Sequence, residues 1–325
     1  MEFMAMNRRL IWMIAPCLTF WGCGGGGPSH QTTEKYYLVC ANPKIPYWQE
    51  AGAGFLAAAR ELGVQAEVVG PESYDAQAER DEFRRIMTKK PAGVLVSVGN
   101  PQLLTPEIDA AVQGGTPVVT VDADAPQSRR LFFVGTNNYE AGQMGGRLLI
   151  KLLNGKGTVV FFTIAGQKNL EDRLDGYRAA LESAPGIKVA AVQDMKGNSS
   201  LAFDIAKDYV DKKNLPDAFV ALESLSGAEI ADVLDRARIE DKVIIAMDAA
   251  QNTLEWIEKG RIAATIAQKP YTMGYYGLKA LADVVLRRPP SLTADFRNDP
   301  RSLLPVFIDT GTLLVDRNNV ANLRK

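Results

Sequence analysis

The fold of this chain is decided by residues 36–98, which read YYLVCANPKIPYWQEAGAGFLAAARELGVQAEVVGPESYDAQAERDEFRRIMTKKPAGVLVSV. Short apolar runs alternate in this stretch with longer amphipathic segments. The pattern predicts strands at 36–41, 65–69 and 93–98, with helices at 47–62 and 76–89 between them. Strands that are apolar on both faces and alternate with helices are typical of parallel sheets covered on both sides. We therefore expect an α/β fold.

The same alternation continues through the rest of the chain. The pattern predicts further strands at 117–121, 157–163, 188–193, 218–222, 242–247 and 262–267, and further helices at 105–113, 170–183, 200–212, 227–238, 253–259 and 271–286. The elements fall into two sets, and a length of 325 residues suits two domains. We predict two Rossmann-like α/β lobes.

Composition excludes several classes of function. The 37 basic and 38 acidic residues give a formal net charge of -1, whereas nucleic-acid binders need a basic surplus, so no nucleic-acid partner is expected. His30 is the only histidine, so a Ser-His-Asp triad or a multi-histidine metal site cannot be built. Asp122 and Asp124 alternate as in a calcium loop but lack its ligand count and glycine. We expect no metal and no cofactor.

The first residues have the pattern of a targeting segment. Arg8 and Arg9 precede an apolar run at 10–21 that is too short for a permanent membrane span, and Gly22 and Cys23 follow it. This order predicts a secretory signal over residues 1–23. Around Cys23 it also resembles a bacterial lipoprotein signal, which implies lipidation of Cys23 and anchoring of the protein to a membrane.

A tether and a single internal cysteine follow the signal. Residues 24–35 begin with GGGGPS and are predicted to form a flexible tether between the anchor and the folded lobes. Once Cys17 is removed with the signal and Cys23 is lipidated, Cys40 is the remaining thiol. It lies in an apolar strand and is expected to be a buried, unpaired residue.

Polar and aromatic residues gather where the predicted strands end. In doubly wound sheets, ligands bind outside the carboxyl ends of the strands. The residues at those ends are 42–48, 122–125, 223–224, Asp248 and Gln268. Aromatic faces together with carboxylates and amides are the set that a sugar requires, because its ring stacks and its hydroxyls hydrogen-bond. The sequence therefore favours a neutral polyhydroxyl ligand.

Four segments resemble the type I periplasmic sugar-binding proteins, the family of the ribose-binding protein, to which the LacI-type repressor core is related. They are IPYWQEAGAGFLAAARELG at 45–63, TPVVTVDAD at 116–124, FFVGTNNYEAGQMGG at 132–146 and GRIAATIAQKPYTMGYYGLKA at 260–280. The resemblance implies two lobes that are joined by a three-strand hinge and close on the ligand. The chain would cross between the lobes near Thr136, Gln268 and Asn298. The N-lobe would then comprise residues 36–136 plus 269–298, and the C-lobe residues 137–268 plus 299–325.

The same resemblance implies a set of ligand-binding residues. They are Asn42, the aromatics Tyr47 and Trp48, Asp122, Arg173, Glu223, Asp248 and the hinge amide Gln268. At three positions the chain departs from the family: Ala123 replaces an arginine, Glu223 an asparagine, and Gly197 aligns near the aromatic that completes the ring sandwich. The pocket is therefore expected to be more acidic than that of the type member.

The predicted function is capture of a sugar or related polyhydroxyl for an ABC importer, without catalysis. The chain would act as a monomer, with permease and ATPase as separate chains. Three alternatives stay open: a ligand-sensing subunit for a chemoreceptor or histidine kinase, a binder of an amine-bearing ligand, and a hydrolase that uses Asp122 and Asp248. At the level of single residues, Tyr47 and Trp48 could instead be core aromatics, and the two aspartates could be helix N-caps.

Overall fold

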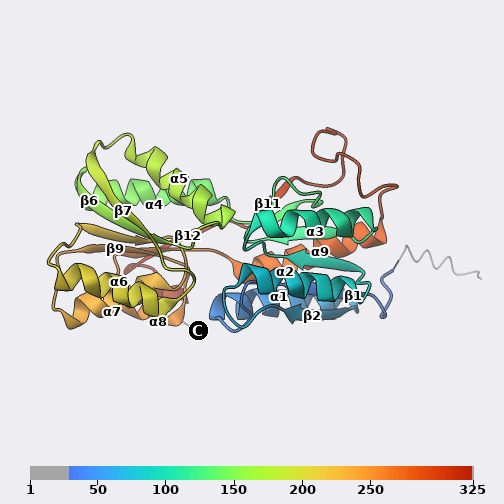
Figure 1. The fold of residues 1–325 in the computed structure, drawn as a ribbon, viewed down its shortest axis with the longest axis horizontal. Helices are drawn as coiled ribbons and strands as arrows, with labels where there is room; N and C mark the ends of the chain where they lie inside the picture. Colours follow the sequence, from blue (N-terminus) through green and yellow to red (C-terminus); the bar gives the residue numbers. More distant parts are fainter. Residues whose placement is uncertain (1–28, 324–325) are drawn as a thin grey trace, which may run out of the picture.

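The computed structural model describes residues 29–323 and shows two lobes side by side (Figure 1). The first lobe contains a six-stranded sheet in the order β11-β5-β4-β3-β1-β2, in which every pair of neighbours is parallel. Its elements are β1 (Lys35–Val39), α1 (Pro46–Leu62), β2 (Gln65–Val69), α2 (Ala76–Met87), β3 (Gly93–Val96), α3 (Pro101–Gln113), β4 (Val118–Val121), β5 (Phe133–Gly135), α9 (Pro270–Leu286) and β11 (Phe307–Asp309).

The second lobe repeats this arrangement with one difference. Its sheet has the order β12-β10-β9-β8-β6-β7, and the edge strand β12 is antiparallel to β10. Its elements are α4 (Asn138–Leu152), β6 (Lys156–Thr163), α5 (Lys168–Leu181), β7 (Gly186–Asp194), α6 (Ser199–Asp211), β8 (Ala218–Ala221), α7 (Ser226–Arg236), β9 (Val243–Met247), α8 (Gln251–Glu258), β10 (Ala264–Ala267), β12 (Leu313–Asp316) and the 3-10 turn Val320–Leu323. The predicted α/β class with two lobes is confirmed.

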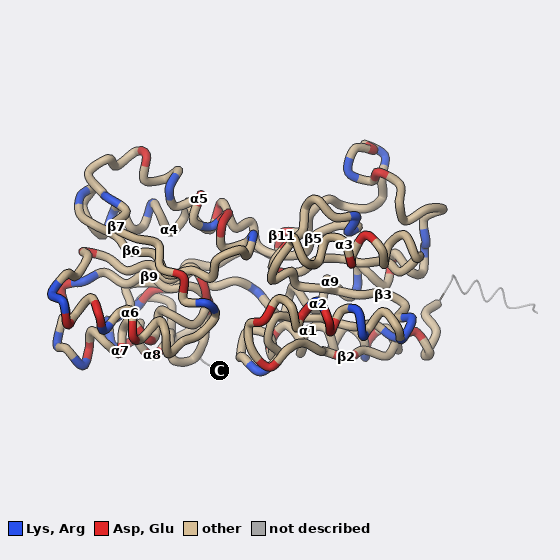
Figure 2. Tube along the Cα trace, viewed as in Figure 1, with Lys and Arg blue, Asp and Glu red and all other residues tan. Residues whose placement is uncertain are grey.

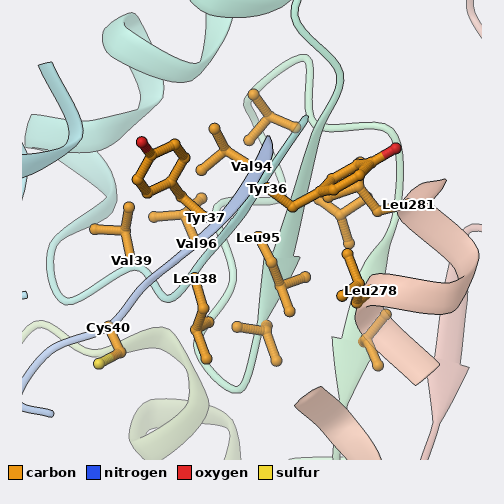
Figure 3. Close-up of a cluster of buried hydrophobic side chains, with 14 of the residues drawn as sticks. Tyr36, Tyr37, Leu38, Val39, Cys40, Val94, Leu95, Val96, Leu278 and Leu281 are labelled. Atoms are coloured by element: carbon orange, nitrogen blue, oxygen red, sulfur yellow. The ribbon is translucent and has the colours of Figure 1, made fainter. Parts of the chain in front are cut away.

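Each lobe has its own apolar core. In the first lobe, β1 and β3 are neighbouring interior strands of the sheet, and α9 covers one face through Leu278 and Leu281 (Figure 3). Burial on both faces explains why these strands are continuously apolar rather than alternating. Cys40 is buried and unpaired at the end of this core, as expected. Acidic and basic residues are interspersed over both lobes (Figure 2).

The chain passes between the two sheets three times. Two passages, between β5 and α4 and between β10 and α9, lie next to Thr136 and Gln268. The third was expected near Asn298, and this expectation is wrong, because β11 still pairs with β5 in the first sheet. The chain crosses only at 310–312, where the backbone N–H and hydroxyl of Thr310 both donate to the carbonyl of Gly135.

The misplaced boundary has a physical cause. Residues 289–306 form no helix or strand, so their sequence lacks the hydrophobic periodicity from which an element could be predicted. These residues contact the first lobe at two points. Leu292 is buried in its core, and the guanidinium of Arg297 donates hydrogen bonds to the carbonyls of Pro126 and Ser128. The C-terminal part of the second lobe therefore begins about ten residues later than expected.

Near the N-terminus, the predicted tether is partly folded. His30 Nδ1 lies 2.8 Å from Glu34 Oε2, the backbone N–H of Gln31 donates to the same carboxylate, and Gln65 donates to the carbonyl of Thr32. Strand β1 then begins at Lys35. The tether prediction is therefore wrong for residues 30–35. The predicted signal, Cys23 and the start of the tether lie outside the described residues, and within 29–323 no helix has the length and hydropathy of a membrane span.

Helix α4 was not predicted from periodicity, because glycines interrupt its apolar face. Gly142, Gly145 and Gly146 all point toward α5, and a Cβ at Gly142 would overlap the carbonyl oxygen of Arg173. Glycine thus allows the backbones of α4 and α5 to approach closely. This close packing fixes the position of Arg173 in the second lobe.

Candidate functional site

A small cavity lies between the lobes, at the carboxyl ends of both sheets. Its volume is about 30 Å³, roughly that of one water molecule, so the lobes are closed on one another. Both lobes and the hinge contribute to its wall: Ala41, Tyr47, Trp48, Tyr74, Ser97, Gly99, Asp122, Ile164, Gln167, Asn169, Leu170, Glu223, Ser224, Asp248 and Gln268. Six of the eight residues expected at the site line this cavity.

Asp122 and Asp248 occupy equivalent places in the two lobes. Asp122 follows β4 and Asp248 follows β9, and each donates its backbone N–H to the neighbouring strand, to Val134 and Ile266 respectively. Both have left-handed backbone conformations, with φ of 63° and 66°. Aspartate tolerates this region better than most residues. The N-cap alternative fails for Asp248, because α8 has Ala250 at its N-cap, and for Asp122, because no helix follows it directly.

Asp122 is held by residues of both lobes. The hydroxyl of Tyr47 donates to Oδ1 at 2.6 Å, and the amide of Asn169, from α5 across the cavity, donates to Oδ2 at 3.4 Å. Burial raises the pKa of Asp122, while the Tyr47 hydrogen bond and the positive charge of Arg173 oppose that rise. The carboxylate therefore links the two lobes in the closed form.

Asp248 is bound to the hinge. The side-chain amide of Gln268 donates to its Oδ1 at 3.0 Å. Burial raises the pKa of Asp248 to about 7, against the opposing charge of Arg173. Both aspartates thus line a buried cavity, in which a hydrogen-bond donor from a ligand would be strongly held.

Arg173 lies behind the cavity wall rather than in it. Its side chain is 1% exposed, and its guanidinium donates to the carbonyl of Leu222 and, at 2.5 Å, to Oδ1 of Asn138. Its Nε has no hydrogen-bond partner. The guanidinium acts on the site through its charge, which opposes the rise that burial causes in the pKa of Asp122, Asp248 and Glu223.

Glu223 lines the cavity, but its carboxylate is engaged by helix α7. It accepts from the backbone N–H groups of Leu225 and Ser226, at 2.5 and 3.2 Å, and from the Ser226 hydroxyl. Backbone N–H groups at a helix start favour a negative charge there. The acid that replaces the family's asparagine therefore caps a helix, and this role was not foreseen in the sequence.

The aromatic residues form one wall. Helix α1 begins at Pro46, which places Tyr47 and Trp48 in its first turn, with their rings 5.2 Å apart and edge to face. Tyr74 joins them from the loop before α2. A Cβ at Gly197 would lie 2.5 Å from the Cβ of Tyr74, so this ring occupies the space that the second lobe leaves free at Gly197. The aromatic expected from the second lobe is thus replaced from the first.

Two expected features take other roles. Asn42 does not line the cavity, because its side-chain oxygen accepts from the backbone N–H of Lys44 at 3.0 Å and closes a local turn. Asp124 forms a bidentate ion pair with Arg130, with N–O distances of 2.5 and 2.6 Å. Both oxygens of Asp124 are engaged in this pair, which explains the Asp122–Asp124 alternation without calcium.

Sequence reasoning missed four of the polar and aromatic lining residues: Tyr74, Ser97, Gln167 and Asn169. Ser97 lies inside the strand expected at 93–98, which in the structure ends at Val96, and Gln167 lies four residues beyond the strand expected at 157–163, so the rule of strand ends selected neither. Tyr74 lies in the loop GPESYD, where no periodicity marks it. Its position becomes clear only when both lobes are seen together.

The chain matches the model of the periplasmic binding protein domain over residues 36–288. It belongs to the periplasmic binding protein family. A curated relative is the D-allose-binding periplasmic protein of Escherichia coli, which is 23% identical over 260 residues, covering 77% of this chain and 84% of that protein.

Solved structures of this family superpose along nearly the whole chain. An arabinose-binding protein, AraP, from Geobacillus stearothermophilus is 31% identical, with a TM-score of 0.74 over 90% of this chain and 100% of that one. A sugar ABC transporter sugar-binding protein from Bacillus halodurans is also 31% identical, with a TM-score of 0.78 over the same shares. The two-lobed architecture is therefore that of the periplasmic binding proteins.

Proposed function

We propose that this protein is the extracytoplasmic binding component of an ABC importer and captures a monosaccharide between its lobes. The observation that carries the proposal is the cavity itself, where Asp122 and Asp248 converge beside the aromatic side chains Tyr47, Trp48 and Tyr74. Carboxylates accept sugar hydroxyls, and aromatic rings stack on the apolar faces of a sugar. Import is favoured over a ligand-sensing role by the names of two relatives, a ribose import binding protein of Bacillus subtilis and the sugar ABC transporter protein of Bacillus halodurans.

The protein performs no chemistry in this proposal. Hydrolysis of a glycosidic bond needs a water molecule or a nucleophile placed between two acids, but Asp122 and Asp248 are each held by neighbouring side chains. The permease and ATPase are separate chains. Lipidation of Cys23 would hold the protein, as a monomer, at the outer face of the membrane.

Capture requires the lobes to separate and close again. The present cavity is too small for a sugar ring, so a ligand enters when the hinge segments at Thr136, Gln268 and 310–312 open. Closure then surrounds the ligand and excludes water, which strengthens each polar contact. A ligand that binds the closed form better than the open form shifts the population toward closure.

A thermal-shift screen over pentoses, hexoses and inositols tests the proposal. A ligand that binds only the folded protein raises its melting temperature, so at least one sugar should give a saturable shift. The variant Tyr47→Ala, which removes a ring and a partner of Asp122, should lose that shift. The exposed Tyr276→Ala on α9 is the matched control and should keep it. A screen in which no sugar shifts the wild-type protein would contradict the proposal.

A further inference from the structure

The charges around the cavity do not balance. Asp122, Glu223 and Asp248 line it, and among the described residues Arg173 is the one cation whose charge acts on all three. Within residues 29–323, none of the three acids has a lysine or arginine nitrogen within ion-pair distance. Glu223 is compensated by the start of α7. Asp122 and Asp248 are buried with hydrogen bonds only from uncharged groups.

Hydrogen-bond acceptors are also in surplus. The amide nitrogens of Asn169 and Gln268 are directed to Asp122 and Asp248, so their amide oxygens are left over. Both oxygens, Asn169 Oδ1 and Gln268 Oε1, are buried without a hydrogen-bond partner, and both side chains are more than nine-tenths buried. Such unpaired buried acceptors are costly unless a ligand supplies donors.

We propose that the ligand is an amino sugar whose protonated amine lies between Asp122 and Asp248. An ammonium group has three donors and no acceptor, whereas a hydroxyl brings both. It therefore complements a wall of carboxylates and unpaired amide oxygens and supplies the missing positive charge. This inference rests on the proposed function, because it names the class of sugar that the same cavity takes.

A further acid, Glu79, is buried near this site, and burial raises its pKa to about 8, so that it carries little charge at pH 7. It is 1% exposed beside the aromatic wall, and its Oε2 accepts from the backbone N–H of Gly99 at 2.9 Å, while Oε1 has no partner. It lines a second cavity of about 230 Å³, which shares Ala41, Tyr74, Gly99, Ile164 and Gln167 with the first. The second cavity is also lined by the exposed Lys196, and Arg130, the other buried cation among the described residues, is paired with Asp124.

Paired ligands test the inference. Titration calorimetry would compare glucosamine, galactosamine and mannosamine with glucose, galactose and mannose and with the three N-acetylated forms. For at least one of the three sugars, the amino form should bind about tenfold tighter or more than the hydroxyl and N-acetyl forms, because only the amino form makes a close charge pair with the aspartates. The variant Asp248→Asn should remove this preference, and Asp208→Asn on the exposed face of α6 should retain it.

Three results would overturn the inference. If every sugar that binds does so at least as tightly in its uncharged form, the ligand is a neutral sugar and the proposed function stands. If Asp248→Asn keeps the full preference for the amine, Asp248 does not hold the ammonium group. If none of the nine sugars binds, the inference fails, while the proposed function still stands if the thermal-shift screen finds a pentose, an inositol or another hexose.

Discussion

The two lobes share one strand order, apart from the direction of one edge strand, but bring different chemistry to the cavity. The first lobe supplies aromatic faces through Tyr47, Trp48 and Tyr74, whereas the second supplies Asn169 and Glu223, with Arg173 behind them. The loops after β1 and β2 in the first lobe and after β6 and β7 in the second differ most in the side chains that they bring to the cavity. The equivalent strand order nevertheless places one aspartate at the same point of each sheet. Topology thus fixes the carboxylates, and the loops determine what surrounds them.

The lobes also differ in how they stabilise the loop beyond that aspartate. In the first lobe, the buried pair Asp124–Arg130 holds the chain that leads from β4 to β5. In the second lobe, Ala249 and Ala250 occupy the matching stretch, and helix α8 follows. The buried cation of the second lobe, Arg173, instead serves the cavity. One arginine is therefore structural and the other tunes the ligand site.

The largest expected effect is on stability and comes from replacing the two buried arginines, Arg130 and Arg173. Arg130→Met leaves Asp124 buried without its partner and should lower the free energy of unfolding by about 3–5 kcal/mol, while sugar affinity stays near that of the wild type. Arg173→Met should destabilise the protein and also abolish binding. Urea unfolding and calorimetry measure the two effects. Normal ligand affinity in Arg173→Met would show that both arginines are structural.

The second prediction concerns the contact of Tyr74 with Gly197. In Gly197→Ala, the new Cβ collides with Tyr74 when the lobes close, and such overpacking costs about 1–3 kcal/mol, or up to about a hundredfold in affinity. Solution scattering should then show less compaction with ligand than in the wild type. Gly166→Ala is the control, since Gly166 also has a positive φ but no atom near its Cβ position. Equal compaction in both variants would exclude a role for this contact.

The third prediction tests the equivalence of the two aspartates. Asp122→Ala and Asp248→Ala each remove charge-assisted hydrogen bonds to the ligand and should each weaken binding by about tenfold to a hundredfold, or roughly 1.5–3 kcal/mol. Titration calorimetry with the sugar found in the screen measures both. Tyr47→Phe separates the loss of the Asp122 carboxylate from the loss of its hydroxyl partner. A large effect in one lobe only would show that the ligand docks asymmetrically.

The smallest expected effect is a pH dependence that comes from the first lobe. Burial raises the pKa of Glu79 from 4.5 to about 8, so the folded protein keeps a proton that the unfolded chain releases. This stabilisation is fully present below pH 4.5 and is lost as the pH rises toward 8. Between pH 6 and 7, Glu79→Gln should remove a fall of about 1.4 kcal/mol in the free energy of unfolding. Urea titrations at the two pH values measure it, with the exposed Glu50→Gln as control; an unchanged slope in Glu79→Gln would contradict the assignment.

Much of the fold and part of the site could be predicted from the sequence for a physical reason. Buried parallel strands are continuously apolar, so their ends are visible, and the residues just beyond them, such as Asp122 and Asp248, follow from topology. Tyr74 could not be found in this way, because its place depends on a glycine in the other lobe. Glu223 was identified as a lining residue, but its helix-capping contacts depend on a backbone path that the sequence does not reveal.

The position at which the described chain begins, in the first lobe and far from the hinge, affects how the protein responds to attachment. Strand β1 begins at Lys35, at the amino end of the first sheet, and the first described residues lie at the pole of that lobe farthest from the second lobe (Figure 1). A force or an attachment applied there acts on one rigid body and crosses none of the three hinge segments. The second lobe can therefore swing through its full range while the first is held still, and a protein immobilised by its N-terminus on a sensor surface should bind its ligand as freely as one in solution.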